Sequence, residues 1–290
     1  MGMIVSKPRQ DVQAWLVISR PAGLPTVWSN VLVAWLLGGG GSASRLIGLL
    51  WGASLVYLGG VLLNDYFDIE YDRHRQPARP LPSGRLQPRL VRRIGAGGLI
   101  LGTVLLMWAG TAPVLTLFLL GAALLYNALH TATKLSPVIM GSCRLLLYLV
   151  SASAATDGVT GFVLWSAIAL AMYVGGLTYI AHTELARRPA AWWPLPLLGT
   201  PVLLALIANR GEYRDPAVRL SLVLALWVVP CLRHALREGG ANRQLTVSGL
   251  AAGIVLVDLL ATSGESPRMI LLFGFLFVAT IALQRYLPAS

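Results

Sequence analysis

The sequence predicts an all-α protein that crosses a lipid bilayer many times. Hydrophobic residues make up 56% of the 290 residues and charged residues only 12%, with a mean hydropathy of +0.68. Soluble domains average about 25% charged residues. Apolar runs of about 17–22 residues recur along the whole chain, each long enough to cross a hydrocarbon core of about 30 Å. The basic residues gather between these runs, as they do in polytopic membrane proteins.

Ten apolar segments are expected as membrane-crossing helices. They cover residues 16–37, 46–64, 93–110, 112–130, 136–155, 161–181, 192–208, 217–236, 245–262 and 268–286. The third and fourth are divided only by the letters GTAP, so nine helices is the alternative count.

The distribution of basic residues predicts how the chain is oriented. With a cytoplasmic N-terminus, 17 lysines and arginines fall on the cytoplasmic side and 5 on the opposite side. This bias supports ten segments with both termini in the cytoplasm. The expected location is the plasma (inner) membrane. The bias also explains the net charge of +11 without a nucleic-acid partner, and no nucleic-acid-binding motif is visible. The expected partner is the lipid bilayer.

The densest cluster of charge follows the second apolar segment, in the stretch NDYFDIEYDRHRQPARPLPSGRL from Asn64 to Leu86. On a continuous helix, one amide and three carboxylates project within little more than a quarter-turn, at about 0°, 100°, 40° and 80° in chain order. They belong to Asn64, Asp65, Asp68 and Asp72. Carboxylates this close together destabilise a helix, so a compensating cation is expected among them.

The residue types in this stretch suit a magnesium ion that holds a diphosphate. Mg²⁺ prefers oxygen ligands and is commonly bound by one or two carboxylates together with substrate phosphates. Guanidinium groups that can bind phosphate oxygens follow in a proline-kinked loop, at Arg73, Arg75, Arg79 and Arg85. A simpler interpretation is a solvated helix end whose acids pair with these arginines. It explains the charge balance but not the one-sided spacing.

Several motifs in this chain resemble one family, the UbiA superfamily of intramembrane prenyltransferases. NDYFDIEYD fits the NDxxDxxxD motif of that family, and RPLPSG is similar to the segment that follows it there. RPAGLPTVWSN, from Arg20 to Asn30, resembles the beginning of the family's first helix. YNALHTATK, from Tyr126 to Lys134, resembles the cytoplasmic end of its fourth helix.

The resemblance implies a UbiA-type bundle of nine to ten transmembrane helices around a central cavity with a cytoplasmic cap. We therefore expect one prenyltransferase-like domain over residues 1–290, with cap loops at about 65–92, 130–136 and 182–192.

The resemblance also implies an enzyme that transfers alkyl groups other than methyl. The expected reaction is Mg²⁺-dependent transfer of an isoprenyl group from a prenyl diphosphate to an unknown acceptor within the membrane. By position, the metal ligands are expected at Asn64, Asp65, Asp68 and Asp72, and the diphosphate-binding residues at Arg20, Arg79, Arg85, Tyr126 and Lys134. Asp68, Asp72 and Lys134 are the expected catalytic residues.

The second aspartate motif of the family, DxxxD at the end of the sixth helix, is altered in this chain. The corresponding letters are LTYIAHTELARRP, with Glu184 as the only acid and therefore a further candidate metal ligand. His182 is a candidate cavity residue, although Mg²⁺ favours oxygen over imidazole. The altered motif resembles a divergent UbiA-like branch, that of the ebo gene clusters.

Two charges lie inside apolar segments, Arg144 in the fifth and Asp258 in the ninth. Intramembrane charges are costly unless they are paired or hydrated, so both are candidate cavity or acceptor-binding residues. A structural Arg144–Asp258 pair is the alternative. Asn30 in the first segment is a further cavity candidate, or a helix-packing amide. Asn127, His130 and Lys134 share one helix face, of which only Lys134 is predicted to be functional.

Three functions are compatible with these features. The leading one is prenyl transfer to an acceptor. A second is a UbiA-type terpene cyclase, which would need no acceptor. A third is a non-catalytic protein that binds a lipid or a prenyl diphosphate and supports export, which the altered second motif favours.

Overall fold

The computed structural model describes residues 7–130, 133–182, 195–237, 243–262 and 266–286, and within these ranges the chain is helical without a strand. The helices of the first half are α1 (Lys7–Ser19), α2 (Leu24–Leu37), α3 (Ala43–Phe67), α4 (Ile69–Arg75), α5 (Pro88–Trp108), α6 (Pro113–Leu129) and α7 (Ser136–Ser153). The second half contributes α8 (Gly161–His182), α9 (Thr200–Ala208), α10 (Arg214–Arg237), α11 (Arg243–Ala261) and α12 (Pro267–Tyr286).

The predicted all-α membrane fold is confirmed. Within the described part of the chain, seven helices are long and apolar enough to cross a bilayer, namely α3, α5, α7, α8, α10, α11 and α12. Shorter apolar helices accompany them, at Pro113–Leu129 and Leu195–Ala208. The third and fourth predicted segments are separate helices, because α5 ends at Trp108 and α6 begins at Pro113.

The first predicted segment, residues 16–37, is not one helix. The chain breaks at Arg20, whose φ of 44° lies in the left-handed region, and a short 3-10 turn over Pro21–Gly23 leads into α2. A non-glycine residue in this region is strained and needs surrounding contacts to hold it. Those contacts belong to the candidate site.

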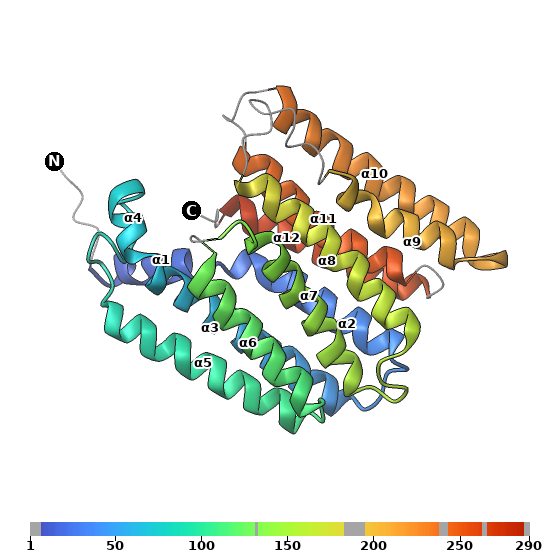
Figure 1. Cartoon of the computed structure of the whole chain (residues 1–290), viewed down its shortest axis with the longest axis horizontal. Helices are drawn as coiled ribbons and strands as arrows, with labels where there is room; N and C mark the ends of the chain where they lie inside the picture. The colour runs from blue at the N-terminus through green and yellow to red at the C-terminus, as the bar shows by residue number, and fades with distance from the viewer. Residues whose placement is uncertain (1–6, 131–132, 183–194, 238–242, 263–265, 287–290) are drawn as a thin grey trace.

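The helix that carries the acidic stretch is also interrupted. α3 ends at Phe67, Asp68 caps it, and the separate short helix α4 carries Asp72. The prediction of a single helix from Asn64 to Asp72 is therefore wrong in this detail. The backbone bonds from Asp68 to Asn64 and from Asp72 to Asp68 still keep a helical spacing, so the register of the acids survives. In Figure 1, α4 stands beside α1 at one end of the bundle.

Glycines bring α3 and α5 into close backbone contact. A Cβ placed on Gly59 would lie 2.6 Å from the carbonyl oxygen of Gly95, and one on Gly102 would lie 2.7 Å from that of Gly52. Real side chains do not tolerate such distances, so these positions require glycine. Small residues that let membrane helices approach closely are typical of transmembrane packing.

The two larger hydrophobic clusters of the described residues both include α2 and α7. The first cluster joins α2, α3, α5, α6 and α7, and the second joins α2 and α7 to α8–α12. Figure 1 shows α2 and α7 between these two groups of helices. The shared helices bring residues from the two halves of the sequence together.

Candidate active site

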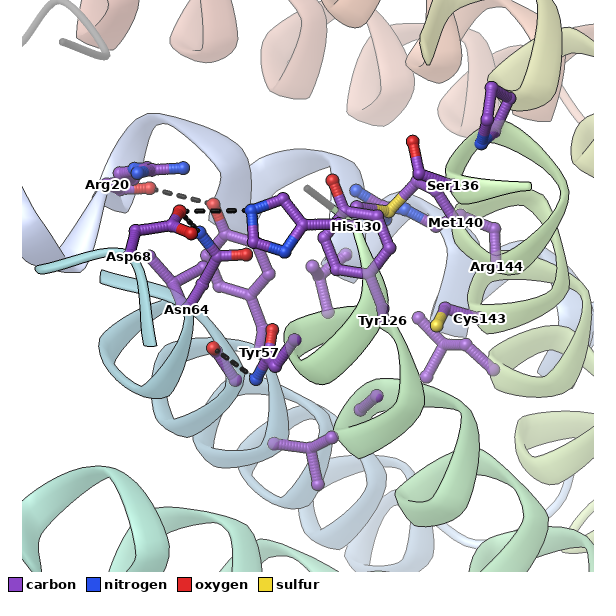
Figure 2. A pocket seen from close by; sticks show the side chains of 18 of the residues that line it. Arg20, Tyr57, Asn64, Asp68, Tyr126, His130, Ser136, Met140, Cys143 and Arg144 are labelled. Atoms are coloured by element: carbon purple, nitrogen blue, oxygen red, sulfur yellow. Dashed lines mark hydrogen bonds and ion pairs between the residues drawn. The ribbon is translucent and has the colours of Figure 1, made fainter. Parts of the chain in front are cut away.

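A cavity of about 920 Å³ opens between α2, α3, α6 and α7. Most of the residues that the motifs indicated line it, namely Arg20, Asn64, Asp68, Asp72, Arg79, Tyr126, Lys134 and Arg144. Its remaining wall is largely apolar and includes Val27, Val56, Leu119 and Leu147. Figure 2 shows Arg20, Asn64 and Asp68 on one side of the cavity and Cys143 and Arg144 on the other, with Tyr126 and His130 between them.

Asp65 holds the first helix break in place. Its carboxylate accepts a hydrogen bond and an ion pair from Arg20 at 2.5 Å. The hydroxyl of Tyr57 donates to the carbonyl oxygen of Arg20 at 2.9 Å, so both the backbone and the side chain of the strained residue are fixed. A Cβ on Gly23 would overlap the Tyr57 hydroxyl, so a larger residue there would displace this tyrosine from Arg20. Asp65 is buried and does not line the cavity, unlike the other acids of the stretch.

Asp68 faces the cavity and contacts two neighbours. Its Oδ2 accepts from the amide nitrogen of Asn64 at 2.9 Å and lies 3.0 Å from Nε2 of His130. His130 in turn stacks on Tyr126, with ring centroids 5.1 Å apart. Burial disfavours the charged ring, but the hydrogen bond and the negative charge of Asp68 outweigh it, so the pKa of His130 lies above its ordinary value.

His130 is the residue that the sequence analysis missed at this site. It lies one helical turn after Tyr126, which was predicted to be functional, and on the same face as Asn127. Asn127 itself donates to the backbone carbonyl of Gly60 at 3.0 Å, which ties the end of α6 to α3. The one-face spacing was the signal available in the sequence, but it did not reveal that Asp68 would be the partner.

Asp72 pairs with Arg79 across the loop that follows α4. The two groups lie 2.7 Å apart, and their side chains are 4% and 14% exposed. Leu81 and Leu86 are buried against α1 and the start of α5, so the loop is anchored on both sides of Pro82. The simpler interpretation, a solvated helix end whose acids pair with the following arginines, is correct in the pairing of Asp72 with Arg79. It is wrong about solvation, because this pair is buried and lines the cavity.

The remaining predicted residues are more dispersed. Lys134 is exposed and lines the rim of the cavity, whereas Arg85 is exposed outside it and donates to the carbonyl oxygen of Ala78 at 3.3 Å. Arg85 instead borders a second depression of about 500 Å³ between α1 and the loop. Glu184 lies outside the described residues, and so does the side chain of His182, which ends α8.

Asp258 is fully buried where α2, α7 and α11 meet. Its Oδ2 accepts from Ser29 at 2.5 Å and from the amide nitrogen of Asn30 at 2.6 Å, and its Oδ1 accepts from Tyr148 at 2.5 Å. The carbonyl oxygen of the Asn30 side chain accepts from Arg144 at 2.6 Å. Arg144 and Asp258 are thus connected through an amide, and among the described residues they form no direct ion pair. Arg144 lines the cavity, while Asn30 and Asp258 lie behind its wall.

The donors around Asp68 fit a hard cation only in part. Within the described ranges, no group of three or more His, Cys, Asp or Glu side chains is arranged around a common point. Oxygen atoms of Asn64, Asp68 and Asp72 nevertheless line one cavity, and oxygen is the ligand that Mg²⁺ prefers. Asp65 is held by Arg20 instead, so the fitting set is smaller than the four residues predicted.

Comparison with known families identifies this arrangement. A model of the UbiA prenyltransferase family matches residues 22–188, which span the helices that form the cavity. The chain belongs to the UbiA prenyltransferase family. Membership confirms both the predicted resemblance and the predicted class of enzyme, one that transfers prenyl groups.

Named UbiA relatives are similar over most of the chain. A digeranylgeranylglyceryl phosphate synthase of Methanopyrus kandleri is 29% identical over 84% of this chain and 77% of its own length. A protoheme IX farnesyltransferase of a Synechococcus species is 31% identical over 91% of this chain and 81% of its own length. These two relatives carry different names, so family membership alone leaves the acceptor of this chain open.

Solved UbiA structures share the fold of the chain. A UbiA homologue from Aeropyrum pernix superimposes with a TM-score of 0.62 at 16% identity, covering 82% of this chain and 95% of its own. A homologue from Archaeoglobus fulgidus, bound to DMAPP and Mg²⁺, has a TM-score of 0.53 at 12% identity and covers 93% and 98%. At these identities the likeness establishes the fold, and the UbiA family together with its apolar helices identifies an integral membrane protein.

Proposed function

We propose that the chain catalyses Mg²⁺-dependent transfer of an isoprenyl group from a prenyl diphosphate to an acceptor within the membrane. One observation carries this proposal. Acids and bases gather at one end of a single cavity whose remaining wall is largely apolar. The charged end suits a metal-bound diphosphate, and the apolar wall suits an isoprenyl chain.

The ligands of the magnesium ion in this proposal are Asn64, Asp68 and Asp72. When bound, the ion neutralises the negative charge that builds up on the departing diphosphate. Asp65 has a different role from the one expected from the motif, because it positions Arg20 at the edge of the cavity. Glu184 remains a candidate further ligand.

Three basic side chains at the charged end are assigned to the diphosphate, those of Arg20, Arg79 and Lys134. Arg20 and Arg79 already hold carboxylates, so their guanidinium groups are oriented before any substrate arrives. Fixed donors of this kind stabilise developing charge without reorganising during the reaction. Tyr126 completes this end beside His130. Arg85 would need to move to take part.

The apolar wall controls the fate of the isoprenyl group. As the bond between its first carbon and the diphosphate oxygen breaks, the electron pair leaves with the diphosphate and an allylic cation remains. The acceptor supplies the electron pair for the new bond and releases a proton. Water would capture the cation in an open site, so exclusion of water by side chains such as Val56 and Leu147 favours the acceptor.

The charged end is proposed to face the cytoplasm, with both termini on the same side. The excess of basic residues on the loops of that side supports this orientation. Cysteines introduced singly at Lys134 and at Asp157 would report it, since Asp157 lies in the turn between α7 and α8. In sealed inner-membrane vesicles with the cytoplasmic face outward, an impermeant thiol reagent should label position 134 and not 157.

Substitution of the proposed metal ligands tests the reaction. The purified chain is incubated with labelled geranyl diphosphate, Mg²⁺ and a membrane lipid extract that supplies acceptors, and transfer of label into lipid is measured. Asp68→Asn and Asp72→Asn should each lower the rate at least about 100-fold. Each removes a negative charge that would hold the Mg²⁺ ion, and the ion would in turn neutralise the departing diphosphate. Chelation of Mg²⁺ should abolish transfer, and restored Mg²⁺ should recover it.

Asp157→Asn is the matched control, since it makes the same change of charge at an exposed position far from the cavity. It should leave the rate unchanged. If geranyl diphosphate and its longer and shorter homologues are not consumed at any Mg²⁺ concentration, the proposed reaction is wrong. Product formed without any lipid extract would instead support the cyclase alternative.

A further inference from the structure

Arg144 is a cation in the cavity wall, and its hydrogen bonds to the described residues all go to neutral groups. Its Nη1 donates to the carbonyl oxygen of Thr26 at 3.3 Å and to the side-chain oxygen of Asn30 at 2.6 Å, and its Nη2 donates to the hydroxyl of Thr26 at 3.0 Å. These three bonds leave part of the guanidinium without an acceptor among the described residues. Because Arg144 also lines the cavity, a ligand there can supply the missing acceptor.

The nearest negative charge in this network does not reach Arg144. The carboxylate of Asp258 is occupied by Ser29, Asn30 and Tyr148, all of which donate to it. The amide of Asn30 separates it from the guanidinium. A charge within a membrane span is costly unless it meets a partner. The network balances the overall charge but leaves the cavity side of Arg144 electropositive.

The same contacts fix the orientation of the guanidinium. Asn30 accepts from Arg144 through its oxygen and donates to Asp258 through its nitrogen, so a flip of its amide would lose both bonds. Thr26 lies one helical turn before Asn30 on α2 and holds the other edge of Arg144. A planar donor group held in this way is prepared to bind a carboxylate or phosphate in a defined geometry.

The surroundings of Arg144 suit an amphiphilic ligand. Apolar side chains of Val27, Met140 and Leu147 line the cavity with it. Figure 2 shows Arg144 across the cavity from Asn64 and Asp68, so a ligand at Arg144 would lie apart from the proposed metal site. The cavity thus offers two polar ends joined by an apolar wall.

We propose that Arg144 binds an oxyanion, a carboxylate or a phosphate, on the apolar acceptor molecule. This assignment rests on the proposed prenyl transfer and deepens it, because it names the chemical class of the acceptor. Asn30 and Asp258 are positioning residues, since they act on the ligand through Arg144. The site selects the anionic amphiphile over its neutral analogue and places it opposite the prenyl diphosphate.

A set of three probes with one apolar body tests this proposal by equilibrium binding to the purified full chain in nanodiscs. The probes are 4-butylbenzoate, 4-butylphenyl phosphate and neutral 4-butylbenzyl alcohol. We expect at least one anion to bind about tenfold more tightly than the alcohol, as charge-assisted pairing with arginine requires. The better of the two anions identifies whether the acceptor group is a carboxylate or a phosphate.

Variants of Arg144 decide whether this residue is responsible. Arg144→Gln should abolish the preference for anions and leave the affinity for the alcohol unchanged. Arg144→Lys keeps the charge without the planar fork and should retain a weaker preference. It also keeps the test valid if Arg144→Gln does not fold, which the unfolding temperature of each variant will reveal. Arg45→Gln makes the same change at an exposed position on α3 and should bind like the unaltered chain.

Three outcomes would overturn the proposal. In the first, the unaltered chain binds the alcohol as tightly as both anions. In the second, Arg144→Gln weakens the binding of all three probes equally, as a purely structural role requires. In the third, Arg144→Gln lowers the affinity for geranyl diphosphate with Mg²⁺ by about tenfold, which would assign the residue to the diphosphate. None of these measurements needs turnover, so failure of this site is distinguishable from failure of the proposed reaction.

Discussion

Charges are handled in opposite ways at the two ends of the cavity. At the end formed by α3 and α4, acids meet bases directly, in the pairs Asp65–Arg20, Asp68–His130 and Asp72–Arg79. In the interior, where α2, α7 and α11 meet, the one acid and the one base are separated by the amide of Asn30. In the first arrangement each acid is bonded directly to a basic side chain, and in the second the acid and the base are joined only through a neutral amide.

The difference shows which charges are available for exchange with ligands. Asp68 and Asp72 line the cavity, so a ligand that enters it can reach their carboxylates, while Asp72 keeps Arg79 oriented. Asp258 is fully buried behind the wall and its donors are neutral, so nothing can exchange with it. The charged end is suited to chemistry, and the interior network to holding a single side chain in place.

The largest loss of stability is expected from removing the interior acid. Asp258→Leu leaves Asn30 and Tyr148 without their carboxylate acceptor, Ser29 with only the carbonyl oxygen of Thr26, and Arg144 without a compensating charge. Breaking a buried ionic network from one side typically costs about 3–5 kcal/mol. Unfolding of the variant in nanodiscs measures this loss. A cost near that of a surface substitution would mean that the interior network does not hold the helices together.

A smaller loss is expected from the pair at the first helix break. Arg20→Gln leaves the buried carboxylate of Asp65 without its cation, and we expect a cost of about 1–3 kcal/mol, because Arg20 is partly exposed and water can enter. Asp65→Asn in the same chain should recover part of that loss, since the unpaired charge is gone. A double variant as unstable as the sum of the single ones would show that the pair is not coupled.

The smallest effect is expected at the exposed pair on α4. Arg73 lies 2.7 Å from Glu70, and the two side chains are 56% and 76% exposed. Exposed pairs of this kind contribute at most about 1 kcal/mol and are screened by salt. Arg73→Gln should therefore change stability and prenyl transfer little. A loss as large as that of Arg20→Gln would remove the distinction between solvated and cavity-facing pairs.

The helices and the acidic stretch were predictable because their signals are local. Apolar length defines the spans, and the four-residue spacing of Asn64, Asp68 and Asp72 places these cavity-facing residues on one side. Asp65 shows the limit of this reasoning. Its spacing is compatible with the metal site, but Arg20, 45 residues earlier, holds it elsewhere. A partner so distant in the sequence is not visible in helical periodicity.

The interior network was only half predictable. Polar groups in apolar segments marked Asn30, Arg144 and Asp258 as unusual, but their order of contact depends on how α2, α7 and α11 pack. Asn30 and Asp258 are separated by 228 residues, and the amide that joins the charges could equally have been a packing residue. His130 was missed for a related reason, because its role depends on Asp68, 62 residues away.

The glycine contact between α3 and α5 has a consequence for the acidic stretch. Since the two backbones touch at Gly59, there is no layer of side chains that could rearrange to absorb a larger residue. Any bulk added there would tilt α3 as a unit and displace Asn64 and Asp68 at its end. The precision of ligand placement is therefore set one or two turns away from the ligands, by residues that have no side chain at all.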